Sequence, residues 1–315
     1  MKKEELSLVP KLCLGTSVLF PSSALYPPHA LPMPSHILLI DCPDETGLVH
    51  RITGVLYRQG GNIVSNSEFV DRDANHFFMR TEFSGEVDAA GMLHELRESL
   101  PKAATIRLAN DAPRRIVVLA TTEPHCLGDL LVRHEFGELN AQILAVISNH
   151  ETLRRLVEKF EIPFHCIEHT GFTGSKLTRA EHEAAVLREL ARYAPEHLVL
   201  AKYMRILSPE FVAQYPRRII NIHHSFLPAF AGAGPYRQAF ERGVKIIGAT
   251  AHFVTNGLDA GPIISQNVIS VDHGHSVADM TRAGRDVEKI VLARALRLVF
   301  EERVFLSGNR TVIFE

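Results

Sequence analysis

The stretch IVVLATTEPHCLGDLLVRHEFGELNAQILAVIS, residues 116–148, indicates the fold class of the chain. Its two ends, residues 116–121 and 143–148, are almost continuous apolar runs, which is typical of strands that are covered on both faces. Between them, residues 127–134 are predicted to form a helix. A strand, a helix and a second strand joined by short connections predict a parallel sheet.

The same alternation continues toward the C-terminus. Apolar runs at residues 163–167 and 197–201 predict two further strands, and residues 151–160 and 178–193 predict helices between them. We therefore expect residues 115–315 to form an α/β domain with a doubly wound, mostly parallel sheet of the Rossmann type. Ligands bind such sheets at the carboxyl ends of the strands, so functional residues should lie there.

The N-terminal half has a different order of elements. A strand from residue 36 is followed by a helix, by a hairpin around residues 71–75, by a second helix at 88–100 and by a last strand at 104–108. The order βαββαβ over residues 35–109 is the ferredoxin-like arrangement.

Two segments flank this domain. Residues 1–34 contain five prolines between Pro21 and Pro34, and we expect a disordered extension there. Residues 110–114, which are polar and contain a proline, are predicted to link the two domains.

Composition narrows the class of protein. The 315 residues are 46% apolar and 22% charged, as expected for globular domains, and 34 basic against 36 acidic residues leave no basic excess for nucleic acid. Four scattered cysteines without a CxxC pair predict neither disulfides nor a thiolate metal site, and indicate the cytoplasm. No apolar run approaches the roughly 20 residues that span a bilayer, so we expect no membrane partner.

Polar residues of catalytic type gather late in the chain. Neither GxGxxG nor GxxxxGK[ST] follows the first strand of the larger domain, which argues against NAD and ATP chemistry. Instead, Asn221 and His223 close an apolar strand, and Asp259 lies on a glycine-flanked loop. An amide, an imidazole and a carboxylate at strand ends suit acyl transfer through a tetrahedral intermediate. From their spacing alone, structural roles at a strand end and in a turn account for them equally well.

Longer motifs around these residues resemble the folate-dependent formyltransferase family. The strings NIHHSFLPAF (221–230) and HFVTNGLDAGPII (252–264) carry the resemblance, with 38 residues separating Asn221 from Asp259. It implies that Asn221, His223 and Asp259 are catalytic.

The resemblance also implies a folate pocket. Met204, Arg205, Ile206 and Leu207 match the segment whose backbone lines the pterin site of the family. His224 either shapes this pocket or relays protons.

Residues 35–109 resemble an ACT domain, most clearly in DCPDETGLV (41–49). The resemblance implies an effector site for a small amino acid such as glycine or methionine, or a role in assembly alone. Its residues would be Asp44, Glu45, Thr46 and Gly47. We also expect a homo-oligomer, a dimer or a tetramer, because the edges and one face of such a sheet are commonly covered by another copy.

An ACT domain in front of a formyltransferase-like domain resembles the formyltetrahydrofolate deformylase family. Its members are hydrolases that release formate and tetrahydrofolate from 10-formyltetrahydrofolate and so supply formate for one-carbon and purine metabolism. Two alternatives stay open, namely formyl transfer from this folate to an amine acceptor and a non-catalytic amino-acid sensor. The transformylases of the wider family carry a glycine-rich phosphate loop where residues 123–125 read Glu-Pro-His, which argues against a phosphate-bearing acceptor.

Folate is expected as the substrate, without a cofactor. No metal is expected either, because adjacent histidines on a strand, such as His223 and His224, point to opposite faces. Desolvation by bound pterin is expected to raise the pKa of Asp259 above its usual value.

Overall fold

The structure, a computed structural model, describes residues 35–110, 112–168, 177–229 and 234–315. The extension predicted for residues 1–34 lies outside the described residues. None of the helices in the described part of the chain is long and apolar enough to cross a membrane.

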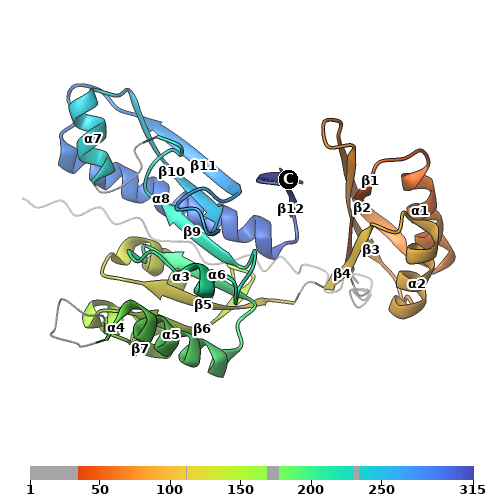
Figure 1. Cartoon of the computed structure of the whole chain (residues 1–315), viewed down its shortest axis with the longest axis horizontal. Coiled ribbons are helices and arrows are strands. Elements are labelled where there is room, and N and C mark those ends of the chain that lie inside the picture. The colour runs from red at the N-terminus through yellow and green to blue at the C-terminus, as the bar shows by residue number, and fades with distance from the viewer. Residues whose placement is uncertain (1–34, 111, 169–176, 230–233) are drawn as a thin grey trace, which may run out of the picture. The chain divides into compact units, whose positions relative to one another are not determined.

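The N-terminal domain is a four-stranded antiparallel sheet with two helices (Figure 1). Its elements are β1 (Ser35–Pro43), α1 (Leu48–Arg58), β2 (Asn62–Asp71), β3 (His76–Ser84), α2 (Ala89–Ser99) and β4 (Thr105–Asn110). The strand order is β2-β3-β1-β4, and every neighbouring pair is antiparallel. The predicted βαββαβ arrangement is therefore confirmed.

Helix α1 follows directly from its sequence pattern. Leu48, Ile52, Val55 and Leu56 share one helix face, and all four are buried against the sheet. Gly47 precedes the helix with φ at 86°, a left-handed conformation that glycine adopts without steric cost.

The larger domain contains a seven-stranded sheet within the described residues. Its strands are β5 (Arg114–Ala120), β6 (Ala141–Ser148), β7 (Phe164–Cys166), β8 (His197–Ala201), β9 (Ile219–His223), β10 (Ile246–Phe253) and β11 (Ile263–Ser270), in the order β11-β10-β9-β8-β5-β6-β7. Five of these strands pair in parallel, in the order β9-β8-β5-β6-β7. Strands β10 and β11 are antiparallel additions at the β9 edge. The predicted doubly wound, mostly parallel sheet is thus confirmed.

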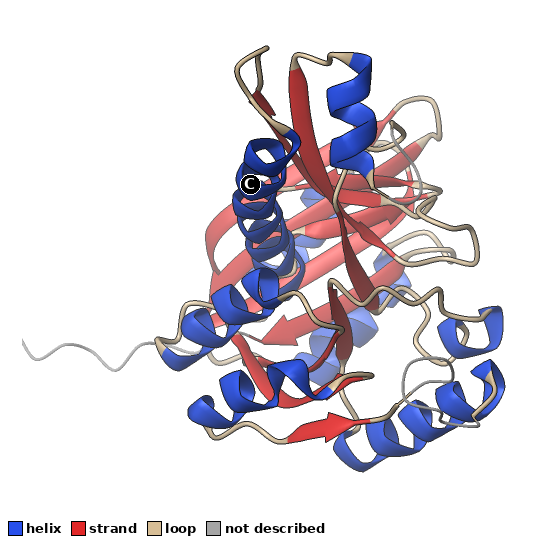
Figure 2. Ribbon diagram, turned by 90° about the vertical axis from the view of Figure 1, so that its left-hand side faces the viewer, coloured by secondary structure: helices blue, strands red, loops and turns tan. Residues whose placement is uncertain are grey.

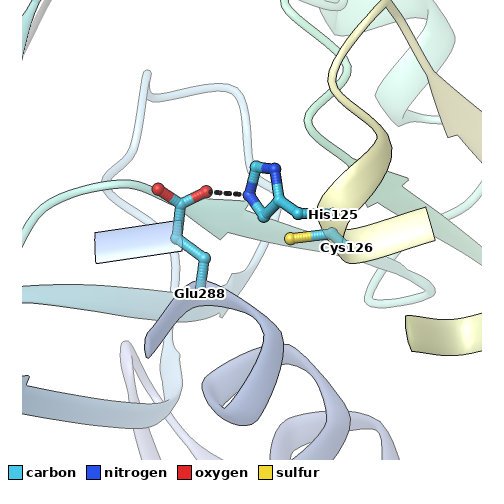
Figure 3. A group of neighbouring side chains, drawn as sticks. All are labelled: His125, Cys126 and Glu288. Atoms are coloured by element: carbon cyan, nitrogen blue, oxygen red, sulfur yellow. Dashed lines mark hydrogen bonds and ion pairs between the residues drawn. The ribbon is translucent and has the colours of Figure 1, made fainter. Parts of the chain in front are cut away.

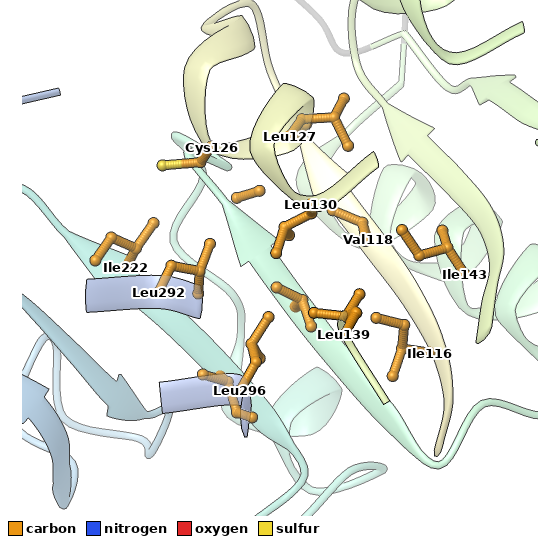
Figure 4. Close-up of a cluster of buried hydrophobic side chains, with 14 of the residues drawn as sticks. Ile116, Val118, Cys126, Leu127, Leu130, Leu139, Ile143, Ile222, Leu292 and Leu296 are labelled. Carbon is orange, nitrogen blue, oxygen red and sulfur yellow. The ribbon is translucent and has the colours of Figure 1, made fainter. Parts of the chain in front are cut away.

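Helices cover both faces of this sheet (Figure 2). They are α3 (Pro124–Glu135), α4 (Arg154–Val157) between the 3₁₀ turns η1 (Glu151–Leu153) and η2 (Glu158–Phe160), α5 (Arg179–Tyr193), α6 (Pro209–Val212), α7 (Pro235–Arg242) and α8 (Val277–Phe300). Helices α3 and α8 pack on one face, where Leu130 and Leu292 meet the side chains of β5 and β9 (Figure 4). Helices α5 and α6 pack on the other face.

The chain closes with a hairpin that the sequence analysis did not predict. It consists of β12 (Val304–Ser307) and β13 (Arg310–Ile313), each only four residues long. Phe305 and Phe314 pack against Ile37, Leu39 and Phe78, and so cover part of the ACT sheet face opposite its helices.

The predicted linker at residues 110–114 is shorter in the structure, because β4 includes residue 110 and β5 begins at residue 114.

Candidate active site

The three residues predicted to be catalytic lie together at the carboxyl end of β9. Asn221 and His223 are two residues apart on this strand, so their side chains point to the same face. Asp259 lies on the loop between β10 and β11, and its Oδ2 is 3.3 Å from His223 Nδ1. The His223 side chain is only 7% exposed, so the imidazole and its carboxylate partner meet in a site largely shielded from water.

The chemistry of His223 is fixed by this pairing. A carboxylate accepts hydrogen bonds, so Nδ1 carries the proton and a neutral ring presents an unprotonated Nε2. Nε2 is buried and has no hydrogen-bond partner among the described residues. A buried, unpaired imidazole nitrogen of this kind is suited to accept a proton from a bound water or substrate.

His252 joins the same cluster, and the sequence analysis gave it no role. It lies on β10 directly opposite Asn221 in the antiparallel register, and its Nε2 is 3.2 Å from Asn221 Nδ2 and 3.6 Å from Asp259 Oδ1. Its Nδ1 donates to the carbonyl of Phe253 at 2.9 Å, which leaves Nε2 free to accept from the Asn221 amide. His252 begins one of the two motifs that resemble the family, so the sequence marked its position. Only the strand register, however, shows that its imidazole contacts both Asn221 and Asp259.

The carboxylate of Asp259 is stabilised in its charged form. The hydrogen bond from His223 holds the pKa of Asp259 well below its usual range, although burial acts in the opposite direction. Without bound pterin the shift is therefore opposite to the expected rise, because the hydrogen bond from His223 outweighs the burial of the carboxyl. Asp259 also has φ at 50°, an uncommon conformation for a residue other than glycine.

His224 lies just beyond the end of β9, and its ring centroid is 5.0 Å from that of His223. The expectation that the two rings point to opposite faces is therefore wrong, because the strand ends before His224. Burial, followed by the positive charge of Lys202, lowers the pKa of His224 to about 4. A neutral imidazole thus borders the site at physiological pH.

The segment predicted to line the folate pocket follows β8. The backbone N–H of Met204 donates to Thr121 Oγ1 at 3.0 Å, and the carbonyl of Ile206 accepts from Arg179 at 2.9 Å, so the end of β5 and the start of α5 hold this segment. Met204 and Ile206 are 58% and 62% exposed, whereas Leu207 packs on the core. Exposed apolar side chains that follow the strand next to the one that carries Asn221 and His223 offer a surface that a flat ring system can cover.

One group of described side chains has the spacing of a metal site. The ligand atoms of His125, Cys126 and Glu288 lie within 4.8 Å of one another (Figure 3). The ammonium of Lys202, however, is 3.1 Å from the Glu288 carboxylate, and burial raises the pKa of the Cys126 thiol far above its usual value. A protein cation already pairs with this carboxylate, and the thiol stays protonated, so the cluster is a poor metal site.

The residues predicted to bind an effector border a groove in the ACT domain. Asp44, Glu45 and Gly47 line a cavity of about 590 Å³ with Glu68 of β2 and with Arg72 in the turn that follows this strand. Thr46 lies in the same loop but is not among the residues that line the cavity.

Comparison with known proteins agrees with this arrangement. Residues 114–296 match the model of the formyl transferase family, and residues 36–99 match that of the ACT domain. Formyltetrahydrofolate deformylase from Haemophilus influenzae is 55% identical over 277 residues, covering 88% of this chain and 98% of the relative. The chain belongs to the formyltetrahydrofolate deformylase family. The Bacillus subtilis relative of the same name is 43% identical over 289 residues, covering 88% and 93%.

Solved structures show the same relationship. The crystal structure of a formyltetrahydrofolate deformylase from Pseudomonas syringae is 41% identical, with a TM-score of 0.84, and the match covers 90% of this chain and 95% of that one. The glycinamide ribonucleotide transformylase 1 of Symbiobacterium toebii is 31% identical, with a TM-score of 0.61, covering 67% and 98%. The deformylase family thus shares the formyltransferase fold with enzymes named for an amine substrate.

Proposed function

We propose that this chain hydrolyses 10-formyltetrahydrofolate with water, producing formate and tetrahydrofolate. The observation that supports this best is the His223 imidazole. Asp259 contacts its Nδ1, while its buried Nε2 has no hydrogen-bond partner among the residues that the structure describes. Membership of the family indicates a formyl folate as the substrate. The His223 imidazole is the acid-base group that hydrolysis of this substrate needs.

The first step is attack by water. His223 Nε2 takes a proton from a water molecule as the water oxygen forms a bond to the formyl carbon. Asp259, whose pKa lies well below its usual range, stays ionised and stabilises the imidazolium that results. Asn221 uses one amide hydrogen to bind His252 Nε2, and its second hydrogen is free to donate to the oxyanion of the tetrahedral intermediate.

The second step breaks the bond between the formyl carbon and N10 of the folate. The imidazolium of His223 returns its proton to N10 as this nitrogen leaves, so tetrahydrofolate and formic acid are released and the imidazole is neutral again. The formic acid then loses its remaining proton to water and is present as formate. The reaction uses only water and the folate, and needs no cofactor or metal. Formate released in this way is available to one-carbon and purine metabolism.

An assay without acceptor tests the proposal. The protein is incubated with 10-formyltetrahydrofolate in the absence of any amine, and formate is measured. Turnover that needs an added amine would contradict hydrolysis and favour transfer, whereas no turnover under either condition would favour a sensor.

We further propose that the groove of the ACT domain binds a small amino acid. The carboxylates of Asp44, Glu45 and Glu68 can hold an ammonium group, and Arg72 can hold a carboxylate, so the groove offers both charges that a free amino acid needs. Titration calorimetry with glycine and with methionine tests this, because heat from neither ligand would contradict it.

A homo-oligomer is proposed on the edge of the same domain. Strand β2 is an edge strand, and it exposes Ile63, Val64 and Phe69 by 36%, 63% and 45%. An exposed edge with apolar side chains is suited to pairing with a second copy. Light scattering that gives the mass of a monomer at micromolar concentration would contradict this, and the mass found would distinguish a dimer from a tetramer.

A further inference from the structure

A buried cluster of polar side chains borders the active site, and the proposed mechanism does not use it. Its centre is the carboxylate of Glu288 on α8, which is 1% exposed. Glu288 Oε1 accepts from the Tyr236 hydroxyl at 2.6 Å. Its Oε2 accepts from His125 Nε2 at 2.8 Å and lies 3.1 Å from Lys202 Nζ. Figure 3 shows the His125 ring, from the start of α3, pointing at this carboxylate.

The surrounding backbone is shaped to hold these groups. Gly284 lies one turn before Glu288 on α8, and a Cβ there would be 2.1 Å from the Tyr236 hydroxyl, so only glycine leaves room for that hydrogen bond. Lys202 has φ at 61°, a conformation that costs free energy in a residue other than glycine. Burial raises the pKa of Glu288, but His125, Lys202 and Tyr236 together lower it to about 2. Glu288 is therefore ionised at physiological pH.

Stability alone does not account for this pair. The Lys202 side chain is only 8% exposed, and desolvating an ammonium and a carboxylate commonly offsets their mutual attraction, so that a packed apolar pair of similar volume is often as stable. The left-handed backbone of Lys202 adds strain. Strain and buried charge kept together at the border of an active site indicate a functional role.

The position of the cluster indicates which role. Lys202 follows β8 and His125 follows β5, and these strands are the next two beyond β9, which carries His223. All three strands are parallel, so their carboxyl ends meet at the edge where such sheets bind ligands. The ring of His224 lies between the two groups, 5.0 Å from the His223 ring and 6.3 Å from that of Tyr236. Protein side chains thus fill the part of this edge that adjoins the catalytic histidine.

We propose that Lys202 determines the specificity of the reaction. The ion pair with Glu288 holds the Lys202 side chain in the space that an amine acceptor would occupy. Water therefore reaches the formyl carbon and an amine does not. This inference rests on the proposed deformylase function. With an amine acceptor, the amine nitrogen would bond to the formyl carbon, the bond to N10 would break, and the amine proton would pass through His223 to N10. The product would be a formamide in place of formate.

The test compares two variants of Lys202. Lys202→Gly removes the side chain at a backbone conformation that glycine adopts freely, whereas Lys202→Met keeps a side chain of similar length without the charge. Each protein is incubated with 10-formyltetrahydrofolate and a small primary amine, glycinamide. The products formate and N-formylglycinamide are then quantified by mass spectrometry.

We expect the parent and Lys202→Met to release formate and to form almost no formamide. Lys202→Gly should raise the ratio of formamide to formate by about 10-fold or more, because even one methylene group in a pocket changes discrimination by about 10- to 200-fold. An unchanged ratio in Lys202→Gly would overturn the inference, as would an equal rise in both variants or a folded Lys202→Gly protein without any turnover. Formate release by the parent protein tests the deformylase function separately.

A second measurement does not depend on turnover. Truncation of Lys202 leaves the Glu288 carboxylate beside an empty space, which a small alkylammonium ion should fill. We expect methylammonium to raise the melting temperature of Lys202→Gly and to leave that of Lys202→Met unchanged. Equal responses of the two variants would show that Lys202 does not occupy a space that an amine can enter.

Discussion

His223 Nδ1 and Asp259 Oδ2 lie 3.3 Å apart, and this contact directs the other ring nitrogen of His223 into a buried position without a partner in the described part of the chain. The pair joins the end of β9 to the loop after β10, two segments separated by a whole helix in sequence. The chemistry of the site depends on this contact, because it sets which nitrogen of the imidazole is basic.

Replacing His223 should remove most of the activity. His223→Ala is expected to lower kcat by about 10²- to 10⁴-fold, the range for a positioned acid-base group. His273, which is exposed on a loop, provides a matched control, and His273→Ala should behave as the parent. A His223→Ala protein within about threefold of the parent would remove this residue from the acid-base role.

Asn221→Ala should lower kcat by about 10²- to 10³-fold if its amide holds the oxyanion. Folate binding, measured by equilibrium titration, should be largely retained, because the contact forms only as the intermediate develops. A loss of binding equal to the loss of kcat would instead make Asn221 a pocket residue.

Asp259→Asn should abolish formate release, with a loss of about 10⁴-fold in kcat as is typical when an imidazole loses the carboxylate that orients it. Because the pKa of Asp259 is lowered in the folded state, its charge also contributes stability above its unfolded value of about 3.9, and this is lost as the pH falls toward the folded value. The acid limb of the rate profile should therefore not arise from this carboxyl. A pH-rate profile of Asp259→Asn equal in height and shape to that of the parent would exclude Asp259 from the mechanism.

His252 should act as a positioning residue. His252→Phe removes the nitrogen that contacts Asn221 and Asp259, and a displacement of either by about 1 Å can cost about 10²-fold in rate. We expect kcat to fall while KM for the folate changes little, since neither partner loses a contact with the pterin. A change confined to KM, or to the melting temperature, would assign His252 to binding or to packing.

Two helical glycines should respond in opposite directions to substitution by alanine. Gly284→Ala brings a Cβ to 2.1 Å from the Tyr236 hydroxyl, and overpacking of this kind costs about 1–3 kcal/mol of unfolding free energy. At Gly128 in α3 the nearest atom is 4.0 Å from the added Cβ, so Gly128→Ala should stabilise the protein by about 0.4–1 kcal/mol. Denaturant unfolding of both variants checks this, and a Gly284→Ala protein as stable as the parent would show that Tyr236 and Glu288 can separate at little cost.

Much of this architecture is predictable from local pattern. The buried strands β5, β6 and β8 are apolar runs bounded by polar turns, and the helix face of α1 follows from its spacing, so both sheets and their order along the chain could be anticipated. The hairpin of β12 and β13 was missed because strands of four residues, only partly buried, carry little periodic signal.

The site was predictable only in part. Asn221, His223 and Asp259 stand in recognisable strings, but the roles of His252 and Lys202 depend on strand register and on contacts between segments far apart in sequence. The direction of the Asp259 pKa shift could not be predicted from the sequence either, because it is the difference between desolvation and hydrogen bonding from His223, whose contact with Asp259 depends on the fold.

The measurement that tests the central claim most directly is formate release from 10-formyltetrahydrofolate in water enriched in ¹⁸O, without any amine. The parent protein should turn over repeatedly and place one solvent oxygen in each formate released, whereas His223→Ala should be slower by about 10²-fold or more under the same conditions. Formate without solvent oxygen, turnover only after an amine is added, or an unimpaired His223→Ala protein would contradict hydrolysis by water activated at His223.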